Sequence, residues 1–169
     1  MIDRIRLSYR LLFAAVVALV IAAMTMGMYL QYVADLEPCP LCVLQRLGYV
    51  VTGLLALPGT VFALGALAQR LLAGLALLTA VAGGAVAAWH AYLIAYPPES
   101  MTCGRPFQWF DDDFPLVVWL PRLFRGQGDC LRVDWTLLGL NIPLWALLVF
   151  VAISMLLAGI VFGRRRVAG

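Results

Sequence analysis

Four long apolar runs dominate the pattern of hydrophobic and polar positions along the chain, and they cover approximately residues 11–30, 43–67, 71–95 and 142–162. Each run reaches the roughly 20 residues that an α-helix needs to cross about 30 Å of hydrocarbon. Because backbone polar groups in lipid must be satisfied within their own segment, an open chain crosses as helices. The pattern therefore predicts an all-α, polytopic membrane protein, a bundle of four transmembrane helices forming a single membrane domain over residues 1–169.

The second and third runs contain residues that are unusual inside a helix. Pro58-Gly59 interrupts the second run, but a helix ending there would have only about 15 residues, too few to span. We therefore expect a kinked helix that continues to about residue 67. The third run is rich in small residues, which let helices approach closely in lipid; these are Gly74, Ala80, Gly83, Gly84, Ala87 and Ala88. We expect them to serve packing rather than catalysis.

Arginine side chains mark one side of this bundle. Arg70 lies in the expected turn between the second and third runs, and the remaining flanking arginines are Arg4, Arg6, Arg10, Arg164, Arg165 and Arg166. By the positive-inside rule these ends, with both termini, are expected in the cytoplasm. The segments of approximately 31–42 and 96–141 are then outward-facing loops.

Composition supports this picture and excludes some functions. The chain is 64% hydrophobic and only 12% charged, whereas soluble domains carry about 25% charged residues. The net charge is +3, and the basic residues cluster at the membrane flanks. We therefore expect contact with membrane lipid and no nucleic-acid partner.

All four cysteines fall in or beside the two outward loops, as Cys39, Cys42, Cys103 and Cys130. A C-x-x-C pair closes a small, strained ring that suits redox exchange better than stapling. A bond between Cys103 and Cys130 would close about 27 residues, and it is either a plain staple or a reducible relay. The stretch 126–129 before Cys130 is typical of a flexible turn. A second C-x-x-C and further histidines are missing, so we expect no zinc site.

Cys42 has the surroundings of a reactive thiolate. If a helix starts at Val43, unpaired N–H groups and the helix dipole stabilise the anion, and Arg46 follows one turn deeper on the same face. The sequence has no Rossmann, haem or iron–sulfur pattern to accept two electrons. A membrane quinone fits, with Arg46 hydrogen-bonded to a ring oxygen.

His90, the single histidine, is expected near the outer surface, level with the start of the second helix. It either belongs to an aromatic belt or touches a quinone oxygen as a polar contact or proton donor. Weaker candidates are Gln45, which faces away from Arg46, and Trp145, which we interpret as an interface anchor. The acids at 111–113 are interpreted as a solvated turn.

The C-x-x-C-x-x-Q-R string from Cys39 to Arg46, with Cys103 and Cys130 in one outer loop, closely resembles the disulfide bond formation protein B (DsbB) family. The resemblance implies that a reduced DsbA-like partner attacks Cys103 and that Cys130 then engages Cys39. It leaves Cys42 as the thiolate facing the quinone, with Arg46 as its cationic partner. It also matches His90 to the family's histidine near the end of the third helix.

The same resemblance implies a place and a cofactor. It points to a bacterial inner membrane with the redox loops facing the periplasm, and to ubiquinone or menaquinone linking the protein to the respiratory chain. The segment 135–145 resembles the family's approach to the fourth helix and is expected to border the quinone. Two other hypotheses remain open. One is a vitamin K epoxide reductase-like oxidoreductase, although that family usually carries its quinone-facing C-x-x-C late in the chain. The other is a non-catalytic membrane protein with disulfide-stapled outer loops.

Overall fold

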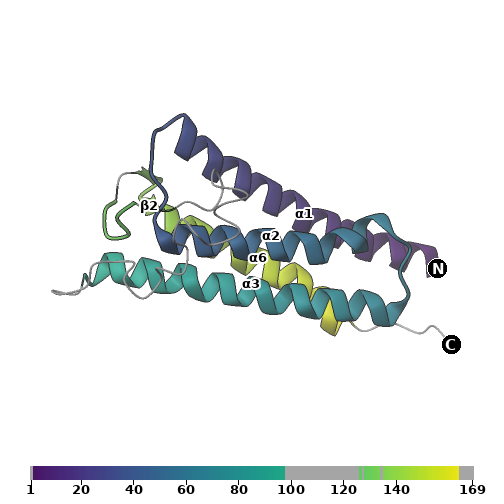
Figure 1. Ribbon diagram of the computed structural model, residues 1–169. Helices are drawn as coiled ribbons and strands as arrows, with labels where there is room; N and C mark the ends of the chain where they lie inside the picture. Colours follow the sequence, from purple (N-terminus) through teal and green to yellow (C-terminus); the bar gives the residue numbers. More distant parts are fainter. Residues whose placement is uncertain (1, 98–125, 127, 134, 164–169) are drawn as a thin grey trace, which may run out of the picture.

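Four long helices make up most of the described chain, which in this computed structural model comprises residues 2–97, 126, 128–133 and 135–163. The helices are α1 (Ile2–Tyr32), α2 (Pro40–Val61), α3 (Ala66–Ala95) and α6 (Ile142–Phe162). Each contains a stretch long and apolar enough to cross a membrane. They run alongside one another in Figure 1. The expected all-α, four-helix membrane architecture is confirmed.

The two ends of the bundle differ. At one end, the cysteine end, lie the starts of α2 and α6, the end of α3, and a short antiparallel hairpin of β1 (Thr136–Leu137) and β2 (Leu140–Asn141) (Figure 1). At the other end α2 turns into α3 and α1 begins (Figure 1). Asn141 caps α6 by accepting the N–H of Leu144 at 3.1 Å, so the hairpin leads directly into this helix.

Helix boundaries differ from the sequence-based expectation at both ends of α2. The helix begins at Pro40, because proline has a preset φ and no N–H to lose at a first helical position. It continues through Pro58 but ends at Val61, earlier than residue 67. Since α3 already begins at Ala66, Arg70 lies inside α3 and not in the turn. The turn is as apolar as the helices, so hydropathy did not reveal it.

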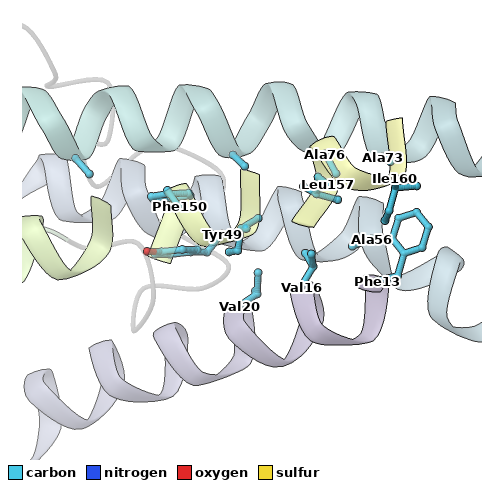
Figure 2. Packing of buried hydrophobic residues seen from close by; sticks show 13 residues of the cluster. Phe13, Val16, Val20, Tyr49, Ala56, Ala73, Ala76, Phe150, Leu157 and Ile160 are labelled. Carbon is cyan, nitrogen blue, oxygen red and sulfur yellow. The ribbon is translucent and has the colours of Figure 1, made fainter. Parts of the chain in front are cut away.

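Small residues let α2, α3 and α6 pack closely around one aromatic pair. The rings of Tyr49 and Phe150 stack with centroids 4.0 Å apart, and they belong to the buried cluster that Figure 2 shows. Gly83 on α3 lies against the Phe150 ring, and a Cβ built on Gly48 would be 3.3 Å from the Gly83 Cα. Ala80, Gly83, Gly84 and Ala87 on α3 are buried and serve packing, as expected. Ala88 is exposed and nothing lies within 4 Å of a Cβ added to Gly74, so the expectation is not met at these two positions.

Gly83→Ala is expected to destabilise the bundle by about 1–3 kcal/mol, the usual effect of overpacking. The new methyl group would overlap the ring of Phe150, which is itself only 1% exposed. Thermal unfolding in detergent, followed by helix content, measures the effect. Gly159→Ala is the matched control, since nothing lies within 4 Å of its added Cβ. An equal loss in both variants would contradict this packing argument.

Two arginines bind helix ends at the end of the bundle opposite the cysteines. Arg10 Nε donates to the Thr60 carbonyl at 3.1 Å, and Arg70 Nη2 donates to the Gly163 carbonyl at 3.3 Å. Carbonyls at helix C-termini carry partial negative charge, so a cation stabilises them. These arginines therefore fasten α1 to α2 and α3 to α6.

Candidate redox site

The C-x-x-C pair is built into the first turn of α2. Cys39 is the N-cap residue, in extended conformation, and its Sγ accepts the N–H of Cys42 at 3.3 Å. Both cysteines are free, and the Cys39 thiol donates to Cys42 Sγ at 3.0 Å. That hydrogen bond and burial raise the pKa of Cys39. Cys39 is therefore the protonated member of the pair and Cys42 the acceptor.

In the dithiol state, an alkylating reagent such as iodoacetamide is expected to modify Cys42 well before Cys39. Only thiolates react readily, and the pKa of Cys39 lies above its ordinary value of 9.0. At pH 9, where an ordinary thiol is largely ionised, Cys39 should therefore still be labelled only slightly. Mass mapping of the labelled peptides measures this, with detergent-unfolded protein as control. Preferential labelling of Cys39 in the folded protein would contradict the assignment.

His90 sits beside Cys39, at the level of the α2 start, as expected from the sequence. Its Nε2 lies 3.0 Å from the backbone carbonyl of Cys130 and 3.8 Å from Cys39 Sγ. A carbonyl only accepts, so Nε2 carries the proton. The ring is only 3% exposed, which excludes His90 from the aromatic belt that was one interpretation of its position.

Gln45 holds the other side of the histidine ring. Its Nε2 lies 3.2 Å from His90 Nδ1, and the amide donates to the nitrogen that has no proton. Sequence reasoning underrated this residue, because Gln45 was judged only by its angle to Arg46. A glutamine inside an apolar helix needs a buried partner, and the single histidine was the available signal.

Cys130 comes close to the C-x-x-C pair. It is buried and disulfide-bonded, and its Sγ, Cys39 Sγ and a His90 ring nitrogen all lie within 4.8 Å of one another. A cysteine binds a metal ion as a thiolate, and the Cys130 sulfur in its disulfide is not a thiolate. This cluster therefore suits sulfur exchange better than metal binding. Cys103 and the acids at 111–113 lie outside the described residues.

A cavity of about 420 Å³ opens on the other side of Cys42, bordered by α1, α2, α6 and the hairpin. Cys42 and Arg46 both line it, as do Trp135 and Trp145. Trp145 therefore borders the cavity, with its indole N–H donating to the Leu137 carbonyl at 3.1 Å. Trp135 and Trp145 thus border this cavity, whereas the quinone expected beside them stays a prediction.

Arg46 is held in this cavity by α1. Its Nη1 donates to Gln31 Oε1 at 2.7 Å and its Nη2 to the Gly27 carbonyl at 3.2 Å. Sequence reasoning did not single out Gln31. Both of these partners are neutral groups, and they fix the position of the guanidinium in the cavity.

His90 lies outside the lining of the large cavity and inside that of a second, smaller one, which it shares with Cys39. Four site residues can be compared in this way, namely Cys39, Cys42, Arg46 and His90. Of these four, Cys42 alone lines both cavities. The structure thus brings Cys39, Cys42 and Cys130 together with His90 on one side. It places Arg46 with Cys42 on the other.

Comparisons with known proteins agree on one family. The family model described as "Disulfide bond formation protein DsbB" matches residues 9–160. A protein of Azoarcus sp. (strain BH72) named "Disulfide bond formation protein B" is 43% identical over 156 residues, which covers 92% of this chain and 94% of that protein. One of the same name from Verminephrobacter eiseniae (strain EF01-2) is 44% identical over 138 residues, covering 81% and 77%.

Proposed function

This chain belongs to the disulfide bond formation protein B (DsbB) family, and we propose that it is a protein-dithiol:quinone oxidoreductase that reoxidises a DsbA-type partner. A DsbA–DsbB–quinone route is known to keep the bacterial periplasm oxidising. The observation that carries the proposal is the position of Cys42. On one side, Cys42 lines the cavity that Arg46 also lines. On the other side, its sulfur accepts a hydrogen bond from the Cys39 thiol.

The first step of the proposed route takes two electrons from the partner. A thiolate of the reduced DsbA-type protein attacks Cys103 of a Cys103–Cys130 disulfide, and Cys130 leaves as a thiolate. The second partner thiol then attacks the mixed disulfide, which releases the partner oxidised and leaves Cys103 reduced. The pair of loop thiols now holds both electrons.

The second step moves the electrons to α2. The Cys130 thiolate attacks Cys39 of a Cys39–Cys42 disulfide, so that a bond forms between sulfurs 130 and 39 and Cys42 leaves as a thiolate. Cys103 then attacks Cys130, closing the loop disulfide and releasing Cys39, which takes up a proton. The described state, with Cys130 disulfide-bonded and Cys39 and Cys42 free, corresponds to the end of this step.

The large cavity has the properties that a quinone needs. It is mainly apolar, it holds one cation in Arg46, and it is lined along α1 from Leu19 to Gln31, a rise of about 18 Å in a helix. Cys42, Arg46, Trp135 and Trp145 would hold the quinone ring, and the apolar side chains of α1 would hold its tail. A bound quinone supplies the capacity to accept two electrons and two protons. Ubiquinone and menaquinone both meet this description.

We further propose that the cysteine end faces the periplasm across a bacterial inner membrane. Arg10 and Arg70 lie at the opposite end, as the positive-inside rule requires of the cytoplasmic side. At the cysteine end, Trp89 and Tyr92 stack with centroids 5.6 Å apart and are about half exposed. Exposed Trp and Tyr rings are typical of a membrane–water interface.

The direct test mixes the purified protein with a reduced DsbA-type protein and a short-chain ubiquinone or menaquinone. We expect one quinone to be reduced for each partner dithiol oxidised. Reduced glutathione in place of the partner serves as the control and should support little reduction. If neither quinone is consumed while the partner stays reduced, the proposed function is wrong.

A further inference from the structure

The segment that carries Cys130 is fastened to the backbone just before α2. The N–H of Gly128 donates to the Pro38 carbonyl at 3.1 Å, and the Cys130 carbonyl accepts from His90 Nε2 at 3.0 Å. These two bonds lie on either side of Asp129. They leave Cys130 only 1% exposed, with its Sγ within 4.8 Å of Cys39 Sγ.

Two glycines allow this close approach. A Cβ on Gly126 would be 2.6 Å from Val43 Cγ2 and 3.0 Å from the Cys39 carbonyl oxygen, and one on Gly128 would overlap the Glu37 carbonyl oxygen. A flexible side chain can change its rotamer to relieve such a contact, but backbone atoms cannot. A larger residue at either position would therefore move the segment that carries Cys130 away from the backbone before α2. The glycines that we interpreted as flexible turn material therefore serve contact, and that interpretation of this stretch is corrected.

We propose that Gly126, Gly128 and His90 form a docking seat for Cys130, which holds its sulfur beside Cys39 and so raises the effective concentration of the one sulfur at the other. This inference rests on the proposed function, since it concerns the same electron route. Two reacting groups that are held in contact react with each other at a high effective concentration, because they do not first have to meet by diffusion. His90 acts here as a positioning residue.

Gln45 completes the seat through the histidine ring. Its amide N–H is directed at His90 Nδ1, which keeps the proton on Nε2, where it meets the Cys130 carbonyl. Both side chains are nearly fully buried, with 4% and 3% exposed. The role assigned to His90 differs from the quinone contact expected from the sequence. It fits the absence of His90 from the lining of the large cavity.

The test measures docking without a quinone or a partner. In a Cys42→Ser, Cys103→Ser background, only Cys39 and Cys130 remain, and their disulfide is equilibrated with reduced and oxidised glutathione. Its equilibrium constant gives the effective concentration of one sulfur at the other. His90→Leu removes the hydrogen-bond donor and Gly128→Ala blocks the approach, so each should lower it about five- to tenfold, the usual effect of one hydrogen bond. His90→Gln restores an amide donor and should retain most of the effective concentration.

Gly159→Ala is the matched control, because that glycine has nothing within 4 Å of an added Cβ, and it should change nothing. Helix content and thermal unfolding identify any variant that fails to fold. An unchanged constant in folded His90→Leu and Gly128→Ala would overturn the proposal, as would equal losses in His90→Leu and His90→Gln. Because no quinone is present, these outcomes are distinct from a failure of the proposed oxidase activity.

Discussion

Cys42→Ser is expected to abolish quinone reduction by the reduced DsbA-type partner, with a loss of at least about a thousandfold in turnover. Of the two free sulfurs, it is Cys42 that lines the large cavity beside Arg46. A serine hydroxyl has nearly the same shape but neither ionises near neutral pH nor forms a disulfide. Stopped-flow measurement of quinone absorbance, with partner and quinone in excess, gives the rate.

Cys39→Ser is the informative companion of this variant. It also stops turnover, since the pair cannot close, but it leaves the Cys42 sulfur beside the cavity. A visible absorption band from the thiolate next to bound quinone should therefore persist in Cys39→Ser and vanish in Cys42→Ser. Quinone reduction that survives Cys42→Ser would remove the basis of the electron route.

The helices were predictable because lipid imposes a simple requirement. A run of about 20 apolar residues has few alternatives in a membrane, and α6 begins at Ile142 and ends at Phe162, where the pattern placed it. The boundary between α2 and α3 was not predictable in the same way. Phe62 is the C-cap residue of α2, and its N–H donates to the Pro58 carbonyl. Because Phe62 and its neighbours are all apolar, hydropathy does not mark this helix end.

The candidate site was predictable where residues are near in sequence. Cys42 and Arg46 share a helix face, so a shared cavity follows from the helical repeat. Gln31 and Gln45 were missed in these roles because their partners, Arg46 and His90, come from other helices. Which faces of two helices meet depends on packing along their full length, and the sequence pattern does not give that rotation.

Glycine is the clearest case of a residue whose role needs the structure. Gly128 and Gly159 are the same type of residue, so the sequence does not distinguish them. In the structure Gly128 lies against a backbone carbonyl, whereas a Cβ added to Gly159 would enter open space. The composition of the residues around Gly128 favoured a turn there. Only the neighbouring segment at Glu37 and Pro38 shows that contact, and not flexibility, requires glycine there.

We expect the charge of Arg46 to be the second large determinant of the rate of quinone reduction. Its guanidinium lines the cavity with Cys42 and is oriented by Gln31 and the Gly27 carbonyl. A positive charge fixed beforehand in an apolar site stabilises both a thiolate and the negative charge that develops on a quinone oxygen. Arg46→Gln is therefore expected to lower quinone turnover by about a hundredfold to a thousandfold. The exchange between Cys39 and Cys130 should be much less affected.

Two variants separate charge from geometry. Arg46→Lys keeps the charge but lacks the planar fork that reaches Gln31 and the Gly27 carbonyl together, so its activity should fall between the parent and Arg46→Gln. Arg10→Gln removes an arginine that binds the Thr60 carbonyl at the opposite end of the bundle, so it should lower thermal stability and leave the quinone step intact. The measurements are the KM and kcat for quinone, with the visible band as a direct signal. Equal effects of Arg10→Gln and Arg46→Gln on kcat would show that the loss comes from the fold and not from the cation at the cavity.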